Sequence, residues 1–360
     1  MPQLTSIASS AEAERKRALL LEAAAAEVVV ARNAATVRWL LCGRGRPVST
    51  AGADAEYTVV LTADGGFVLF PDIEASRVAA EEHFEELGFE PTPFPWFEGS
   101  GEALRSIIGG RSALDGSAVD ELAAPLRRTL DADELRRYRA AGADAADVLV
   151  ETLATLTPTT RESDTAAELG GGLLRRGFSA PVLLVAGDER QRVHRHPVPT
   201  AARLERHALL AVTAERHGLH VSMTRVVSFG RAPRQLAKRT AVAAAVDAAM
   251  LLASQPGVTL GDVFDVAVDA YSTHGFPDEW RRHHQGGLTG YRGREVFAIP
   301  GDDTPFPASC AVAWNPSITG GAKSEDTALV TDHSVEIITR TPELPEIEID
   351  GLARPAIVEV

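Results

Sequence analysis

The sequence of 360 residues has only two cysteines, Cys42 and Cys310, which lie far apart in the chain. Two such residues build no disulfide framework and leave no CxxC pair for a zinc site, so Cys310 is expected to be a small buried residue. No stretch approaches the roughly 18 uncharged apolar residues that a membrane helix needs. The apolar run from Ala23 to Ala31 is short and contains Glu27. The sequence therefore predicts neither a disulfide scaffold nor a membrane protein.

Positive charge is also scarce, since 36 Lys and Arg stand against 50 Asp and Glu, a formal charge of −14. A nucleic-acid-binding protein normally carries a basic surface, so this balance argues against that class. The amino terminus lacks the basic-then-apolar pattern of a signal peptide, which predicts a cytoplasmic protein. No repeat of fixed short period is present. A small-molecule substrate is the expected partner.

The length predicts two domains. Alternating helical and strand patterns predict an α/β domain over residues 1–124, and a second domain over residues 125–360. Within the first domain, residues 11–32 are expected to form a helix because strong helix formers dominate without Gly or Pro. Residues 36–42 are expected to form a strand, and residues 57–70 a β-hairpin.

Histidine is concentrated in the second half, where nine of the ten lie between residues 194 and 333. Residues 283–295, His-His-Gln-Gly-Gly-Leu-Thr-Gly-Tyr-Arg-Gly-Arg-Glu, place imidazole, amide, guanidinium and carboxylate groups between four glycines. These groups can bind an anion, move protons or hold a metal, and glycine allows close backbone approach. A solvated charged turn is the alternative interpretation.

Four motifs follow one another in a fixed order. They are His196-Pro-Val-Pro-Thr, then Gly218 with Thr224-Arg225 and Gly230, then His283-x-x-Gly286-x-x-x-Gly290 with Glu295, then Asn315-Pro316 with Lys323-Ser-Glu325-Asp. Together with the order of helices and strands, these motifs resemble the creatinase, prolidase and aminopeptidase P group, the M24 peptidases. The resemblance implies an α/β (α+β) protein, with a creatinase-like α/β domain followed by a domain of the "pita-bread" fold. It also implies a homodimer.

The resemblance breaks down at the metal ligands. Metallopeptidases of the family hold two divalent ions with two Asp, one His and two Glu. The corresponding positions here read Ala211, Ser222, Gly287, Asn315 and Glu325. One carboxylate cannot hold two divalent cations, because each needs several charge-matched ligands. These departures predict a site without metal or other cofactor.

The resemblance also implies roles for individual residues. His196 corresponds to the family histidine that moves protons, and in creatinase, a metal-free member, this residue is the implied general acid or base. His283 and Glu325 complete the catalytic set that the resemblance implies. The predicted substrate-binding residues are His284, Gln285, Tyr291, Arg294, Glu295, Asn315, Lys323 and Arg225. Tyr291 is as readily a core residue, and Lys323 with Glu325 could form an ordinary surface ion pair.

Three functions remain open at this point. The first is a metal-independent, creatinase-like hydrolase or lyase that acts on a C–N bond of a small amino-acid-, peptide- or guanidine-like substrate. The second is an inactive pseudo-peptidase that serves as a binding module. The third is a prolidase-like metallopeptidase with a site rebuilt from His196, His283, His284 and Glu325, although no helical zinc motif supports it.

Overall fold

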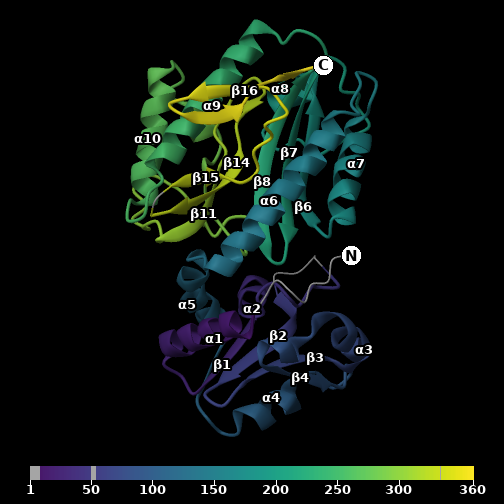
Figure 1. Ribbon diagram of the computed structural model, residues 1–360, viewed down its shortest axis with the longest axis vertical. Helices are drawn as coiled ribbons and strands as arrows, with labels where there is room; N and C mark the ends of the chain where they lie inside the picture. Colours follow the sequence, from purple (N-terminus) through teal and green to yellow (C-terminus); the bar gives the residue numbers. More distant parts are fainter. Residues whose placement is uncertain (1–8, 50–53, 333) are drawn as a thin grey trace. The chain divides into compact units, whose positions relative to one another are not determined.

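The computed structural model describes residues 9–49, 54–332 and 334–360, and the chain divides into two compact units (Figure 1). The first unit holds the described residues up to Arg137, together with residues 217–219. The second holds Tyr138–Arg216 and His220–Val360. The expected boundary after residue 124 falls inside helix α5 (Ser117–Arg128) of the first unit. None of the described helices is long and apolar enough to cross a membrane.

The first unit contains a five-stranded mixed sheet in the order β4-β3-β2-β1-β5. Its strands are β1 (Val28–Asn33), β2 (Asp54–Thr62), β3 (Gly66–Pro71), β4 (Phe89–Phe94) and β5 (Ala113–Asp115). β2 and β3 pair antiparallel, which confirms the hairpin predicted over residues 57–70. The helices are α1 (Ser10–Ala24), α2 (Ala34–Leu40), α3 (Ala75–Arg77), α4 (Gly101–Ile108) and α5.

Two sequence predictions in this unit were wrong. The helix expected over residues 11–32 ends at Ala24, because Ala25 takes a left-handed conformation with φ 45°. The β-branched run that follows forms the buried strand β1 instead, since it pairs with β2. The strand expected over residues 36–42 is the buried helix α2, which the Asn33 side chain caps by accepting from the Ala35 N–H. A short helix that is buried on every side has no periodicity that distinguishes it from a buried strand.

The second unit contains two main sheets. One has the order β18-β8-β7-β6 and the other β10-β9-β11-β14-β15. The strands of the first are β6 (Ser179–Gly187), β7 (His207–Arg216), β8 (Leu219–Ser228) and β18 (Val358–Glu359). Those of the second are β9 (Gly286–Thr289), β10 (Val296–Phe297), β11 (Ser309–Trp314), β14 (Asp326–Thr331) and β15 (Val335–Ile337).

Short two-stranded ribbons and, among the described residues, five helices accompany these sheets. The ribbons are β12 (Ser317–Ile318) with β13 (Ala322–Lys323), and β16 (Glu346–Ile349) with β17 (Leu352–Pro355). The helices are α6 (Ala132–Leu153), which begins in the first unit, α7 (Glu162–Arg175), α8 (Asp188–Val193), α9 (Arg234–Ala253) and α10 (Leu260–Thr273). α7 packs on β6, and α9 and α10 pack on each other beside β11 (Figure 1).

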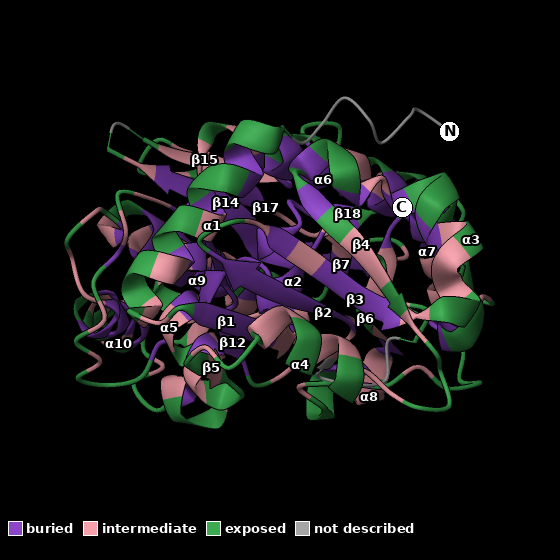
Figure 2. Ribbon diagram, turned by 90° about the horizontal axis from the view of Figure 1, so that it is seen from below, coloured by how far each residue is buried: buried purple, intermediate pink, exposed green. Residues whose placement is uncertain are grey.

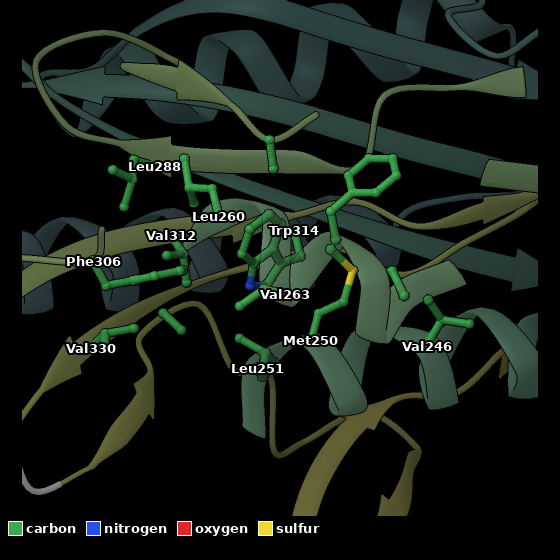
Figure 3. Close-up of a cluster of buried hydrophobic side chains, with 14 of the residues drawn as sticks. Val246, Met250, Leu251, Leu260, Val263, Leu288, Phe306, Val312, Trp314 and Val330 are labelled. Carbon is green, nitrogen blue, oxygen red and sulfur yellow. The ribbon is translucent and has the colours of Figure 1, made fainter. Parts of the chain in front are cut away.

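A large hydrophobic core fixes the strands that carry the candidate site. α9 and α10 contribute Met250 and Val263, which lie around Trp314 of β11 (Figure 3). The indole N–H of Trp314 donates to Ser254 Oγ at 2.9 Å. Colouring by burial shows many strand residues buried and the helices with exposed faces (Figure 2), and β9, β11 and β14 are buried almost throughout. Burial of this apolar area holds β9, β11 and β14 firmly in place.

The two sheets of the second unit meet where β8 runs beside the start of β14. The Thr224 N–H donates to the Glu325 carbonyl at 3.0 Å, and the two residues form an isolated bridge. Side chains alternate across an extended backbone. Arg225 accordingly lies on the other side from Thr224 and pairs with the buried carboxylate of Asp326 at 3.0 Å. The Thr224–Glu325 side of this junction carries the candidate site.

Candidate active site

A buried carboxylate, Glu325, lies at the junction between two cations. Its Oε1 accepts from Arg294 Nη2 at 3.0 Å, and its Oε2 accepts from Thr224 Oγ1 at 2.7 Å. Lys323 Nζ lies 2.7 Å from Oε2. Burial by itself raises the pKa of Glu325, but the charges of Lys323 and Arg294 outweigh it and lower that pKa to about 2. Glu325 is therefore ionised at neutral pH and is already paired with two side-chain cations.

Arg294 extends this arrangement across the site. Its Nη1 donates to the Gly293 carbonyl at 2.6 Å and to Ser222 Oγ at 3.3 Å. Ser222 Oγ also lies 2.9 Å from Thr213 Oγ1. Burial lowers the pKa of Arg294, and Glu325 opposes that effect. The guanidinium thus fills the space between Ser222 of β8 and Glu325, two of the positions at which the resemblance expects metal ligands.

The backbone at Gly287 accepts only glycine. Its φ is 153°, and a Cβ built there would lie 2.1 Å from the Val296 carbonyl oxygen. Gly287 pairs with Ala313 of β11 on one side and with Phe297 of β10 on the other, so neither neighbouring strand can move away cheaply. Gly287 is therefore a paired residue inside the sheet, and it offers no side chain to a ligand.

The donor set at the five family positions does not match a two-metal centre. The residues there are Ala211, Ser222, Gly287, Asn315 and Glu325. They supply a carboxylate, an amide and a hydroxyl, whereas hard divalent ions need several oxygen ligands with matching charge. The side-chain cations of Arg294 and Lys323 already lie against the carboxylate of Glu325, and their positive charges would repel a metal ion bound there.

Three histidines lie close together next to Glu325 and Arg294. The sequence left open that these histidines help to form a rebuilt metal site. We call His196, His283 and His284 the three-histidine cluster. His196 precedes β7, and the other two precede β9. His283 Nε2 lies 3.0 Å from His196 Nε2. The rings of His283 and His284 stack with centroids 4.3 Å apart, and the edge of Phe297 packs on His284.

The surroundings keep all three rings neutral at neutral pH. Burial, followed by the ammonium of Lys323, lowers the pKa of His283 to about 2. Burial, followed by the guanidinium of Arg294, lowers the pKa of His284 to about 4. Burial and Lys323 also lower the pKa of His196, the exposed member. Each ring therefore has one N–H and one lone pair.

Gln285 stabilises the backbone next to the three-histidine cluster. Its Oε1 accepts from the Tyr271 hydroxyl at 2.9 Å, and its Nε2 donates to the carbonyls of His283 at 2.6 Å and Trp280 at 3.3 Å. The side chain is completely buried. These bonds fix the backbone that carries His283, so Gln285 acts as a positioning residue instead of meeting a ligand directly.

The other predicted binding residues are spread more widely. Tyr291 is buried, as the core interpretation expected. Arg225 donates to Thr341 Oγ1 at 2.9 Å and to the Thr339 carbonyl at 3.0 Å, inside a buried network that also reaches the main-chain carbonyl of Glu325 at 3.4 Å. Asn315 Oδ1 is buried and has no hydrogen-bond partner among the described residues. Glu295 lies half-buried, with its side chain against Gly290.

A cavity of about 240 Å³ opens beside Lys323. Its lining includes the cationic side chains of Arg192, Arg195, Arg282 and Lys323 and contains no Asp or Glu among the described residues. Arg195 Nη2 donates to Glu279 Oε2 at 2.6 Å and to Thr319 Oγ1 at 2.9 Å, which holds it in place. Sequence reasoning followed the histidines and missed these arginines, although two of them directly precede His196 and His283.

Comparison with known proteins identifies the family to which the chain belongs. The model of metallopeptidase family M24 matches residues 136–332, which is more than half of the chain. The chain belongs to this family, and its fold is the mixed α/β pita-bread architecture that the motifs predicted. No curated protein matches the chain.

Several solved structures share this fold. Dipeptidase PepE from Mycobacterium ulcerans matches with a TM-score of 0.72 at 17% identity, over 98% of this chain and 99% of that one. The prolidase from Pyrococcus horikoshii OT3 matches with a TM-score of 0.71 at 16% identity, over 92% and 98%. The amino-terminal domain of the FACT complex subunit SPT16 from Cicer arietinum matches with a TM-score of 0.65 at 13% identity, over 92% and 97%. At such identities the likeness shows the fold alone.

Proposed function

We propose that the chain is a hydrolase or lyase that cleaves a C–N bond of a small amino-acid-, peptide- or guanidine-like substrate without a two-metal centre, with His196 as the proton shuttle. The observation that supports this most strongly is the contact of 3.0 Å between His196 Nε2 and His283 Nε2. It joins an exposed imidazole to a half-buried one at the edge of the site. The family relationship supports the hydrolase class.

The charges around Glu325 support metal independence. In a two-metal enzyme the ions supply positive charge that the carboxylates bind. Here Arg294 and Lys323 supply fixed positive charge at Glu325, within 3.0 Å and 2.7 Å of its oxygens. Buried, preorganised cations stabilise negative charge that develops on a substrate, as an oxyanion hole does.

Proton transfer is assigned to the pair of neutral imidazoles. His196 accepts a proton from the attacking water and delivers it to the leaving nitrogen, which is the work of a general base and then a general acid. Because its Nε2 faces His283 Nε2 at 3.0 Å, His283 orients the His196 ring, while its own pKa of about 2 leaves the proton on His196. Gln285 keeps the His283 backbone in place for this transfer.

The substrate is inferred to carry an anionic group. The sequence placed Arg294 among the substrate-binding residues, but this guanidinium is held by Glu325 and Ser222. The basic cavity beside Lys323 offers four cations for this group. Each of them pairs with Glu189, Glu279 or Glu325, but none of the described residues that line the cavity is acidic. A carboxylate bound there would lie next to the site, as an amino-acid-like substrate requires.

Substitution of His196 tests this proposal. The full chain and its His196→Ala variant would be assayed for amine or ammonia release from dipeptides, N-acylated amino acids and guanidino acids, with chelator present. His274→Ala, an exposed histidine at the end of α10, is the matched control. We expect turnover to fall by about 100-fold or more in His196→Ala alone, the usual contribution of general acid–base catalysis. Equal turnover in all three proteins would overturn the assignment.

A binding module is the second candidate function. The similarity to the SPT16 domain of a FACT complex, a named component of a larger assembly, supports it. An absence of turnover on every substrate class, combined with saturable binding of one of them, would favour this alternative over catalysis.

A further inference from the structure

The three-histidine cluster has a property that the proposed reaction does not require. One ring nitrogen from each of His196, His283 and His284 lies within 4.8 Å of the other two. The proposed proton transfer uses the first two of these rings, and His284 adds a third ligand-type nitrogen. The three come from two separate segments, the chain before β7 and the chain before β9.

The spacing fits a small metal ion. Two nitrogens at about 2.1 Å from a tetrahedral zinc ion lie about 3.4 Å from each other. The two facing Nε2 atoms of His196 and His283 are 3.0 Å apart. The other separations extend up to 4.8 Å, so the rings have to turn for all three nitrogens to reach one ion.

Two other ring nitrogens of the cluster are buried. His283 Nδ1 and His284 Nδ1 are buried, and neither has a hydrogen-bond partner among the described residues. For His283 the Nε2 atom faces His196, so an ion bound there would leave the proton on Nδ1 and would not itself satisfy that atom. An imidazole that coordinates a metal through one nitrogen keeps its proton on the other.

The neighbouring charges restrict the kind of ion. Arg294 and Lys323 lie against one carboxylate, Glu325, so the adjoining residues carry a net charge of +1. Magnesium, calcium and manganese prefer carboxylate ligands, which this cluster does not offer. Zinc, nickel and copper bind neutral imidazole well. The same positive charge opposes a divalent ion, so binding depends on the three imidazole bonds, and it favours an anion, such as hydroxide or a carboxylate, in the fourth position.

We propose that His196, His283 and His284 form a site for one late transition-metal ion, Zn²⁺ or its neighbours, separate from the five positions of the family's two-metal centre. The ion takes the lone pairs of the three rings and leaves a fourth position open to an anion. One consequence rests on the proposed function. His196 cannot accept a proton while it binds the metal ion, so the ion inhibits the enzyme until a chelator removes it.

Zinc binding to the full chain tests the site without any activity assay. Chelator-stripped protein would be titrated with Zn²⁺ in competition with a chromophoric chelator, and with Co²⁺ to record the visible absorption of a tetrahedral complex. We expect one ion per chain. Loss of a residue that only supports a metal ligand lowers metal affinity by about 10- to 100-fold. His284→Ala removes a ligand itself, so its zinc affinity should fall by at least about 100-fold. His274→Ala is the control, and circular dichroism would show that both variants fold.

Two results would contradict the proposed metal site. Zinc affinity in His284→Ala equal to that of the parent chain, or no binding by the parent chain, would overturn the site. A second variant, His284→Gln, keeps a polar group of similar length and should also lose the Co²⁺ spectrum. Binding without inhibition would leave the metal site standing and refute the proton-shuttle role of His196, so the two proposals fail separately.

Discussion

Replacing Glu325 with Gln removes the negative charge from the centre of the candidate site and leaves two buried cations unpaired. The carboxylate accepts from Arg294 at 3.0 Å and Thr224 at 2.7 Å and lies 2.7 Å from Lys323 Nζ. Its side chain is only 5% exposed, so solvent screens these contacts little. The free energy that this pairing contributes can be worked out from the pKa.

The pKa of Glu325 falls from 4.5 to about 2. At about 1.4 kcal/mol per unit, this shift corresponds to about 3 kcal/mol of stability at neutral pH. Because the folded-state pKa is depressed, the contribution is fully present above pH 4.5 and is lost as the pH falls towards 2. Removing one partner of a buried ion pair costs about 3–5 kcal/mol. Both arguments predict that Glu325→Gln destabilises the second unit by about 3 kcal/mol or more at pH 7.

Hydrogen exchange of the β14 amides in increasing urea measures this loss in the second unit alone. Glu343→Gln is the matched control, since Glu343 is exposed. We expect the control to match the parent chain, and the deficit of Glu325→Gln to shrink as the pH is lowered from 5 to 3. A deficit below about 1 kcal/mol at pH 7, the value of an exposed pair, would refute the reasoning.

Two further predictions concern the fold. Gly287→Ala should lower the stability of the second unit by about 3 kcal/mol or more through backbone clash and strain, since its Cβ would meet the Val296 carbonyl at 2.1 Å. Gly301→Ala, at φ 72° in open space, should cost only about 1 kcal/mol in the same exchange experiment, and equal costs would contradict the clash. In the first unit, buried Glu12 pairs with Lys16 and Arg137 at 2.6 Å, and its pKa is lowered to about 2. Acid should therefore weaken α1 between pH 4.5 and 2 in the parent chain, as read by exchange of the α1 amides, whereas pH-independent exchange equilibria would argue against the pairing.

The sequence predicted the fold well because ordered motifs carry it. His196, Thr224-Arg225 and Glu325 occur in the order of the motifs on which the resemblance rests. The errors lie in the first unit, at the end of α1 and at α2. Both errors concern short apolar segments, where burial against neighbours selects the structure and local pattern does not.

The site was harder to predict than the fold. The sequence could bring Lys323 and Glu325 to one face by alternation, and the structure adds the ion pair at 2.7 Å. It could not show that Arg294 reaches the same carboxylate from 31 residues away, or that Gln285 is enclosed by Tyr271. Such contacts depend on the pairing of β9, β11 and β14, which is set by distant parts of the chain.

The central claim is that two side-chain cations occupy the place of a two-metal centre. Equilibrium binding of Mn²⁺ to the full, chelator-stripped chain, followed by electron paramagnetic resonance of the free ion, tests it most directly. Manganese prefers carboxylates over a neutral histidine cluster, so it reports on the family positions and not on the proposed zinc site. The account predicts no stoichiometric binding, with Glu325→Gln unchanged from the parent chain. Two Mn²⁺ per chain, lost in Glu325→Gln, would contradict it.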